Sequence, residues 1–324
     1  MLADVAAALA PAAETSVTRA SRTRLARYSH PVELHRGNHQ GGDQLLNVTF
    51  FGVRGSTPCS CDSTRRYGGN TACVALETSG QPPIVLDLGT GLRFWGDTLD
   101  ETECFRGSAL VSHLHWDHIQ GLPFFTPVLR PGARFDVYAP PQSGEGSVEG
   151  AFNAIMRPPF FPVTAEELLG DIRFHEAWNV DLNIEGAKVM AREVPHVGPT
   201  SGYRIEMGGT TVAYIPDHQM PSEGPLTVSD AVLELCDGVD LLIHDSQYTV
   251  AEFSAKSTWG HCTAEFALQV AHEAGARRLV LFHHDPSHGD AAVDEILARA
   301  QGLARGTGVE EVMAAHEGLV ISFD

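Results

Sequence analysis

The chain has 324 residues, an apolar fraction of 43% and a formal net charge of -19 at pH 7. This apolar fraction is enough for a hydrophobic core, but no stretch approaches the roughly 20 apolar residues that span a bilayer, so we expect a soluble protein. The acidic excess argues against a general nucleic-acid binder, because clustered Lys and Arg bind phosphate backbones. Bound divalent cations would offset that charge locally, so a small anionic substrate stays admissible.

Residues 1–45 show no sustained hydrophobic periodicity and end in a polar, glycine-containing stretch. We therefore expect a disordered N-terminal extension, followed by one folded domain over residues 46–324. A basic segment followed by an apolar one, as in secretory signals, is lacking, and six cysteines in a chain this long do not form a disulfide framework. These features favour a cytoplasmic protein with reduced thiols. Cys59 and Cys61 are the only close cysteine pair, and either an incidental role or an accessory metal site stays open.

Apolar segments predict the strands of the first third of the chain. They cover residues 45–52, 72–76, 84–87 and 109–111. The third segment ends at Asp87, which we expect to support a neighbouring site by hydrogen bonding instead of binding a metal.

The fourth strand leads directly into His113-Leu114-His115-Trp116-Asp117-His118. Three imidazoles and one carboxylate within six positions are hard to explain as packing. Because alternate side chains of a strand share a face, His113 and His115 can bind the same metal ion. The turn that follows redirects Asp117 and His118 toward a second ion.

Residues 122–175 are rich in proline and aromatic residues. They predict little helix beyond residues 149–156 and a turn that begins with the Thr164 to Glu167 capping box. The segment suits either a substrate lid beside the metal site or ordinary core packing, and both interpretations stay open.

The second half of the chain predicts three more strands and then an alternation of helices and strands. The strands cover residues 188–191, 202–205 and 211–215; the alternation comprises helix 229–235, strand 239–244, helix 263–273, strand 278–282, helix 291–304 and strand 318–323. Several of these strands are followed by His or Asp, as a site along one edge of a sheet requires. We expect an α/β fold with two packed sheets flanked by helices.

The candidate ligands divide into three imidazoles for one ion, two imidazoles and a carboxylate for a second ion, and one bridging carboxylate. The first set is His113, His115 and His196, the second is Asp117, His118 and His283, and the bridge is Asp217. Imidazole and carboxylate ligation without thiolate favours Zn²⁺, with Mn²⁺ or Fe as alternatives. Two such ions about 3.5 to 4 Å apart hold a bridging hydroxide and clamp the oxygens of a displacement at phosphorus. Three neighbouring histidines are expected to bond locally instead: His218, His244 and His284.

The motif His-x-His-x-Asp-His at His113 to His118 resembles that of the metallo-β-lactamase superfamily, and the resemblance extends from Leu46 to the C-terminus. Within that superfamily the chain looks most similar to the RNase Z and cyclic-phosphate phosphodiesterase branch. The resemblance implies an αββα sandwich with the metal site at one edge of its two sheets. It also implies that His261, oriented by Asp245, is the general acid for the leaving oxygen, with Asp117 as a further catalytic residue. A carboxylate partner raises the pKa of a histidine and holds its tautomer.

The chain departs from the tRNA-processing members of that branch. RNase Z enzymes carry a long arm between the positions of His196 and Asp217, where this chain has only twenty residues. Together with the acidic composition, the missing arm favours a small phosphodiester, such as a cyclic nucleotide or cyclic sugar phosphate, over tRNA. Some cyclic-phosphate phosphodiesterases hold an extra zinc partly by cysteines, so Cys59 and Cys61 stay candidates. A homodimer is a further expectation, because dimers are common in this branch.

We therefore predict a dinuclear metal-dependent phosphodiesterase in which a metal-bridging hydroxide attacks a small phosphodiester. Thioester or lactone hydrolysis at the same centre, and RNA processing without a tRNA arm, are the alternatives. A flavodiiron oxidoreductase is disfavoured, because those proteins usually carry Glu where this chain has His115 and need a flavin domain. A binding protein without turnover is disfavoured by the complete ligand set.

Overall fold

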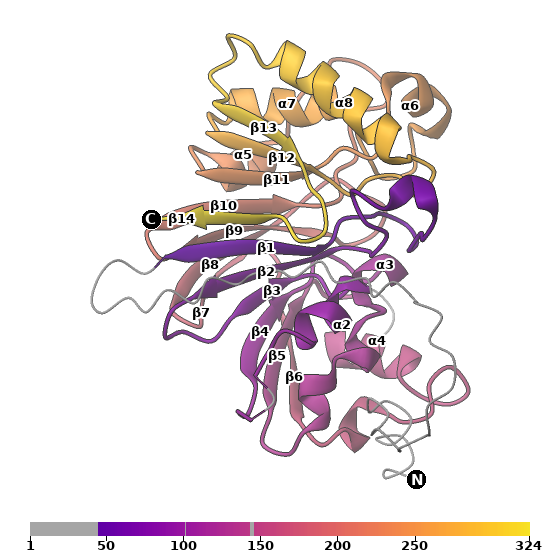
Figure 1. Cartoon of the computed structure of the whole chain (residues 1–324), viewed down its shortest axis with the longest axis vertical. Coiled ribbons are helices and arrows are strands. Elements are labelled where there is room, and N and C mark those ends of the chain that lie inside the picture. The colour runs from indigo at the N-terminus through magenta and orange to yellow at the C-terminus, as the bar shows by residue number, and fades with distance from the viewer. Residues whose placement is uncertain (1–44, 101, 143–145) are drawn as a thin grey trace, which may run out of the picture. The chain divides into compact units, whose positions relative to one another are not determined.

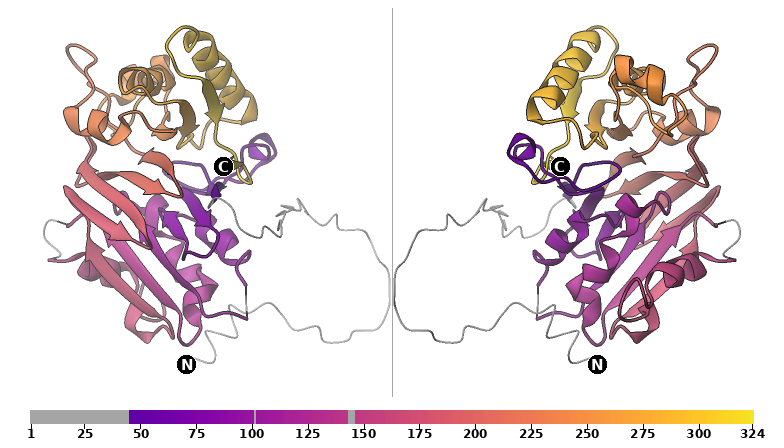
Figure 2. Two further views of the ribbon diagram at one scale, coloured as in Figure 1. Left: turned by 90° about the vertical axis from the view of Figure 1, so that its left-hand side faces the viewer. Right: turned by 90° about the vertical axis from the view of Figure 1, so that its right-hand side faces the viewer.

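The computed structural model describes residues 45–100, 102–142 and 146–324. Two seven-stranded sheets pack face to face, and helices cover their outer faces (Figures 1 and 2). The predicted α/β sandwich is confirmed. The predicted extension over residues 1–45 lies almost wholly outside the described residues, so the domain boundary stays a prediction. Within the described ranges no helix is both long and apolar enough to cross a membrane, and the cytoplasmic location also stays a prediction.

The first sheet combines an antiparallel half and a parallel half. From edge to edge it contains β14 (Val320–Phe323), β1 (Leu46–Gly52), β2 (Cys73–Thr78), β3 (Ile84–Leu86), β4 (Arg106–Leu110), β5 (Arg134–Ala139) and β6 (Asp171–Glu176). The β3 to β6 strands run parallel, whereas β14, β1, β2 and β3 pair antiparallel. The first and the last described strands are thus neighbours, with Leu46 opposite Phe323.

The second sheet has the same division. From edge to edge it contains β13 (Glu311–Ala314), β12 (Arg278–Phe282), β11 (Leu241–Asp245), β10 (Thr210–Ile215), β9 (Ser201–Met207), β8 (Ala187–Glu193) and β7 (Val180–Ile184). Strands β10 to β13 run parallel, and β7 to β10 pair antiparallel. The short connection between His196 and Asp217 is occupied by β9 and β10, so it forms sheet and not an arm.

Short helices connect and cover the strands. They are α2 (Gly91–Gly96), α3 (Trp116–Ile119), α4 (Val148–Ile155), α5 (Asp230–Cys236), α6 (Val250–Lys256), α7 (Ala264–Glu273) and α8 (Asp290–Leu303), with 3-10 turns η1 (Asp62–Thr64), η2 (Leu122–Phe124), η3 (Thr126–Leu129) and η4 (Ala165–Glu167). Serine or threonine side chains accept a backbone N–H at the starts of α4 to α7. Such caps satisfy N–H groups that have no partner within the helix.

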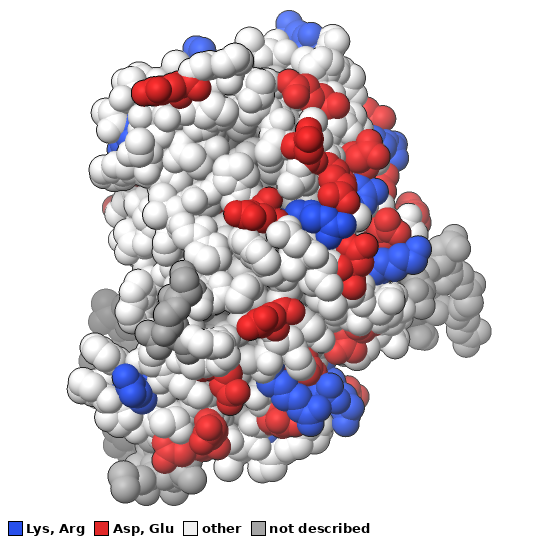
Figure 3. Space-filling model, turned by 180° about the vertical axis from the view of Figure 1, so that it is seen from behind, with Lys and Arg blue, Asp and Glu red and all other residues white. Residues whose placement is uncertain are grey.

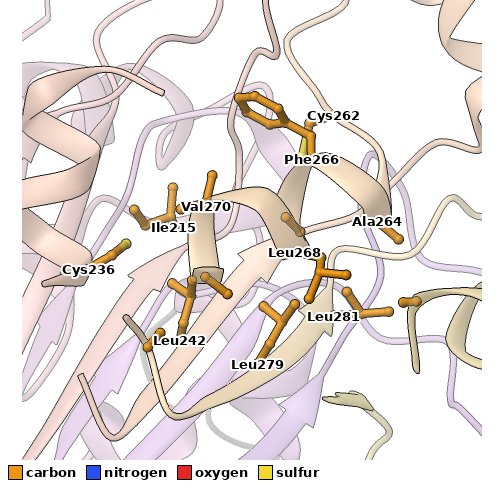
Figure 4. Close-up of a cluster of buried hydrophobic side chains, with 14 of the residues drawn as sticks. Ile215, Cys236, Leu242, Cys262, Ala264, Phe266, Leu268, Val270, Leu279 and Leu281 are labelled. Carbon is orange, nitrogen blue, oxygen red and sulfur yellow. The ribbon is translucent and has the colours of Figure 1, made fainter. Parts of the chain in front are cut away.

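The hydrophobic core has three layers. One layer lies between the sheets and includes Phe50, Tyr214 and Phe282. A second lies between the first sheet and α2 and α4, and a third between the second sheet and α5, α7 and α8. Figure 4 shows side chains of α7 in this third layer beside Leu242 and Leu279. Because both faces of the central strands are covered, β11 and β12 read as continuous apolar runs.

Several elements were not predicted from the sequence: β5, β6, β7, β13, α2 and α6. Strands β6, β7 and β13 lie at sheet edges, where exposed positions carry charged side chains and weaken the apolar pattern. The segment 122–175 contains β5 and most of β6, in addition to the expected helix and capping box.

Charged side chains on one face of the molecule gather along one margin, while broad areas of that face carry no charge (Figure 3). Basic groups there lie beside acidic ones. Ion pairs among the described residues include those of Arg192 with Asp181 and Glu234, each at 2.9 Å. Exposed pairs of this kind add little to stability. The face shown therefore offers no continuous basic surface for a phosphate backbone.

Candidate metal centre

Three imidazoles meet at the end of β4. The backbone leaves β4 extended, so His113 and His115 share a face, with His113 Nε2 2.8 Å from His115 Nδ1. His196, from the loop after β8, places its Nε2 3.3 Å from the same His115 nitrogen. The structure thus brings together the first predicted ligand set.

The second predicted set meets beside the first and is buried. Asp117 and His118 lie in the first turn of α3, and His283 follows β12 with a positive φ of 61°. His118 Nε2 and His283 Nε2 lie 3.1 Å apart, and they lie 3.2 and 3.1 Å from Asp117 Oδ2, respectively. The ends of parallel strands in both sheets therefore converge on one site.

Asp217, two residues after the end of β10, faces both sets with different oxygens. Its Oδ1 lies 3.8 Å from His113 Nε2 and 3.7 Å from His196 Nε2. Its Oδ2 lies 3.1 Å from His118 Nε2 and 3.4 Å from His283 Nε2. This is the arrangement that a carboxylate bridging two cations requires.

The geometry of this cluster fits divalent metal ions. Ligand atoms around a tetrahedral ion with bonds of 2.0–2.1 Å are about 3.3–3.4 Å apart, close to most of the separations seen here. Asp217 Oδ2 is buried without a hydrogen-bond donor among the described residues. A buried carboxylate oxygen without a partner is costly, and a cation would satisfy it. The choice of Zn²⁺ over Mn²⁺ or Fe stays a prediction.

The electrostatic environment differs between the two sets. Burial, together with neighbouring imidazoles, lowers the pKa values of His113, His115 and His196, so these rings stay neutral and can bind a metal. Burial also opposes the protonation of His118, but Asp117 and other nearby carboxylates raise its pKa well above the usual value. Metal binding at the second set must therefore displace a proton.

Partners on the far side of the rings fix their orientation. Asp87 Oδ2 lies 2.7 Å from His118 Nδ1 and accepts the hydroxyl of Tyr214 at 2.7 Å, while Oδ1 accepts the Ser112 N–H at 2.7 Å. Asp87 is completely buried and has a positive φ of 59°. The structure thus gives Asp87 the supporting place expected from the sequence. His196 Nδ1 similarly donates to the carbonyl of Gly260 at 2.6 Å.

The loop after β1 also supports the centre, which sequence reasoning missed. The Ser56 N–H donates to Asp117 Oδ2 at 2.6 Å. A Cβ on Gly55 would lie 2.4 Å from both Gln247 Oε1 and His283 Nδ1, so only glycine fits there. These two atoms are buried and have no hydrogen-bond partner among the described residues. The only sequence signal was a glycine in a turn.

His261 and Asp245 lie beside the metal ligands. His261 Nδ1 is 3.0 Å from Asp245 Oδ2 and 3.6 Å from Asp217 Oδ1. Asp245 Oδ1 also accepts the Gln247 N–H at 2.9 Å. Burial lowers the pKa of His261, but Asp245, together with Asp217 and Asp117, raises it above the usual value. Because Nδ1 is engaged by Asp245, Nε2 is the atom available for proton transfer.

Other candidates lie apart from the cluster. His218 Nδ1 is 2.9 Å from His244 Nε2, and His284 Nε2 donates to the Ala315 carbonyl at 2.9 Å, so these histidines bond locally as expected. In the part of the chain that the structure describes, Cys59 and Cys61 belong to no group of three metal-type ligands.

Comparisons with known proteins identify related sequences. A family model described as "Beta-lactamase superfamily domain" matches residues 108–284. A protein named Ribonuclease Z from Brevibacillus brevis is 37% identical over 92 residues, which are 27% of this chain and 29% of the relative. A Ribonuclease Z from Synechococcus sp. (strain WH7803) is 26% identical over 310 residues, 80% of this chain and 92% of the relative.

Solved structures share the fold. The metallo-beta-lactamase fold protein YhfI from Bacillus subtilis has a TM-score of 0.65 at 19% identity, covering 86% of this chain and 100% of its own. A diphosphatase from the PhnP family has a TM-score of 0.61 at 19% identity, covering 86% of this chain and 97% of its own. The predicted resemblance in fold is confirmed.

Proposed function

This chain belongs to the beta-lactamase superfamily, and on that premise we propose that it hydrolyses a small phosphodiester with two divalent metal ions. The prediction of a metal-dependent hydrolase is confirmed by the family and by its relatives. The phosphodiester substrate and the two-metal centre are our proposal. The observation that supports it most is Asp217, whose two oxygens face two separate sets of ligands.

Seven side chains would hold the ions. They are His113, His115, His196, Asp117, His118, His283 and Asp217. Bound ions of this kind supply a hydroxide at neutral pH and neutralise charge on phosphate oxygens. The protein contributes a rigid frame, because Asp87, Ser56 and Gly260 each hydrogen-bond to a ligand side chain.

His261 acts as the general acid in this proposal. Asp245 holds its Nδ1 and raises its pKa, so the ring keeps a proton that Nε2 can donate to the departing alkoxide. A positioned acid of this kind contributes roughly 10²- to 10⁴-fold to the rate. Asp117 has an indirect role, because its Oδ2 contacts His118 and His283, the other ligands that would hold the second ion.

The substrate reaches the centre from the side of the first ligand set. His115 is exposed, whereas the His196 side chain is only 1% exposed and Asp117, His118 and His283 are buried. A phosphodiester therefore meets His115 first. A homodimer stays a prediction.

RNA processing is the second candidate, because relatives named Ribonuclease Z align over nearly their whole length. These relatives do not support our expectation that a small phosphodiester is favoured over tRNA. Two features favour a small substrate: β9 and β10 occupy the connection where an arm would lie, and the formal charge is -19. Binding along an RNA backbone would need basic groups that the chain provides sparsely.

A direct test compares substrates on protein loaded with Zn²⁺ or Mn²⁺ after metal analysis. We expect two ions per chain and hydrolysis of bis-p-nitrophenyl phosphate and of cyclic phosphates. His113→Ala should lose metal and activity, whereas His175→Ala, whose ring contacts Asp136 on β5, should keep both. Faster cleavage of precursor tRNA would favour the second candidate. Lactone or thioester hydrolysis without phosphodiester hydrolysis would overturn the proposal.

A further inference from the structure

Ser56 lies in the loop after β1, directly beside the metal centre. Its backbone N–H donates to Asp117 Oδ2 at 2.6 Å, and Asp117 is one of the ligands proposed for the second ion. Ser56 is nevertheless exposed, whereas Gly55 before it is buried. The residue is therefore held at the centre and reached by solvent at the same time.

The backbone at Ser56 adopts a rare conformation. Its φ is 61°, and the Thr57 N–H donates to the Gly55 carbonyl at 2.6 Å, so the three residues form a tight turn with Ser56 at its middle. Such turns with a positive φ are rare and strained for residues other than glycine. Three of the five non-glycine residues with a positive φ in the described part of the chain, Ser56, Asp87 and His283, lie at the metal centre. Backbone strain of this kind concentrates at functional sites, because the surrounding structure must hold it in place.

The Ser56 hydroxyl accepts one hydrogen bond and has a proton left to donate. Gln247 Nε2 donates to Ser56 Oγ at 3.3 Å. Among the residues that the structure describes, none accepts the hydroxyl proton of Ser56. Because a serine hydroxyl can donate one hydrogen bond while it accepts another, this proton is available to a ligand at the centre.

Gln247 also connects Ser56 with the proposed general acid. The Gln247 backbone N–H donates to Asp245 Oδ1 at 2.9 Å, and Asp245 Oδ2 lies 3.0 Å from His261 Nδ1. Gln247 is buried, so its amide fixes the hydroxyl from the interior of the protein. Ser56 is thus bonded to the ligand Asp117 through its own N–H and, through Gln247, to the pair that would protonate the leaving group.

We propose that Ser56 is a substrate-binding residue whose hydroxyl donates a hydrogen bond to a non-bridging oxygen of the phosphodiester. This inference rests on the proposed function and adds a contact to its substrate. A hydrogen bond from a hydroxyl to a charged oxygen is roughly twice as strong as one between neutral groups. Because Gln247 already orients the hydroxyl, little reorganisation is needed when the substrate binds.

Stereochemistry at phosphorus provides the test. In the Rp and Sp forms of methyl p-nitrophenyl phosphorothioate, sulfur, a weaker hydrogen-bond acceptor than oxygen, replaces one or the other non-bridging oxygen. On the metal-loaded protein, Ser56→Ala should lower kcat/KM for methyl p-nitrophenyl phosphate by roughly 10- to 150-fold, the range for one hydrogen bond to a charged group. It should slow the form that presents oxygen to Ser56 more than the form that presents sulfur, so the ratio of the Rp and Sp rates should change.

Ser56→Gly separates the hydroxyl from the backbone. Glycine adopts a positive φ without strain and keeps the N–H that bonds to Asp117, so both Ser56 variants should lose the same contact and bind Zn²⁺ like the wild type. Ser60→Ala, which changes another exposed serine of the same loop, is the matched control and should alter neither the rate nor the ratio. Wild-type rates in Ser56→Gly together with a loss in Ser56→Ala would assign the effect to the backbone and overturn the proposal. An unchanged ratio of Rp and Sp rates in both variants would also overturn it.

Phosphate binding separates this inference from the proposed function. Inorganic phosphate, titrated calorimetrically into the Zn²⁺-loaded protein, should bind to both Ser56 variants at least about tenfold more weakly than to the wild type. If the wild type hydrolyses no phosphodiester, the proposed function fails, and the phosphate titration still decides whether Ser56 binds phosphate oxygens. Equal affinities in the wild type and both variants, or no binding by the wild type, would refute the contact.

Discussion

Replacing Asp87 by Asn tests whether this buried carboxylate controls metal binding through His118. The amide keeps the shape of the side chain and can still accept the Ser112 N–H through Oδ1. At the position of Oδ2, however, an NH₂ group would face His118 Nδ1, 2.7 Å away. Two N–H donors cannot bond, so the ring must shift or carry its proton on Nε2, the atom that faces the second ion.

The expected magnitude follows from this single contact. Loss of a partner that orients a ligating histidine typically lowers metal affinity 10- to 100-fold, which is about 1.4–2.7 kcal/mol. In the metal-free protein, the loss of this hydrogen bond to a charged group should lower the free energy of unfolding by about 1.5–3 kcal/mol. The second ion should be affected most, because His118 contacts Asp87 directly, whereas His113 is connected to it only through Ser112 Oγ, which lies 2.9 Å from Asp87 Oδ2 and 3.0 Å from His113 Nδ1.

Competition titration with a chromophoric chelator, resolved into two Zn²⁺ steps, measures this effect, and urea unfolding of the metal-free protein measures stability. Tyr214→Phe is the control, because it removes another hydrogen bond to Asp87 Oδ2 without touching His118. If the Asp87→Asn variant bound both Zn²⁺ ions with the affinities of the wild-type protein, the reasoning would be refuted. So would an equal loss of affinity in Tyr214→Phe.

Three further perturbations have defined outcomes. Gly55→Ala should weaken the second metal step by displacing His283, whereas Gly302→Ala in α8, where a Cβ meets nothing within 4 Å, should raise stability by about 0.5–1 kcal/mol; equal metal affinities in both variants would contradict this. In a pH profile of kcat/KM, activity should fall as pH rises through the raised pKa of His261. Asp245→Asn removes the main cause of that raised pKa and should move this basic limb to lower pH, so an unmoved limb would exclude His261 as the acid. Chelation should lower the thermal midpoint, since ions at 1,000 times Kd stabilise by about 4 kcal/mol, and an unchanged midpoint would argue against ligation in the native state.

The sequence revealed those parts of the site that depend on local pattern. His113 and His115 follow a strand at alternate positions, and Asp117 and His118 follow at once, so period and spacing were sufficient to group them. His283 and Asp217 could be predicted because they lie one and two residues after the end of an apolar strand. Their assignment as ligands stays a prediction that the geometry supports.

The parts of the site that the sequence did not predict depend on contacts between distant segments of the chain. The Gln247 side chain donates to Ser56 Oγ at 3.3 Å across 191 positions of sequence. No local pattern encodes such a contact, and a glycine such as Gly55 is common in turns that lie far from any binding site. Ser56 follows Gly55 in the same turn, but its exposure beside Asp117 follows only from the fold. Strands β6 and β13 were missed because an edge strand needs little apolar character.

The pairing of β1 with β14 has a consequence for how the chain folds. Leu46 and Phe323 are opposite each other although 277 positions separate them. The outer edge of β1 therefore stays open during synthesis until the ribosome has released residues 320–323. Non-local pairing of this kind raises contact order and slows folding. An open edge strand also invites pairing with another chain, so a ribosome-bound intermediate of this protein should depend on chaperones until its last strand arrives.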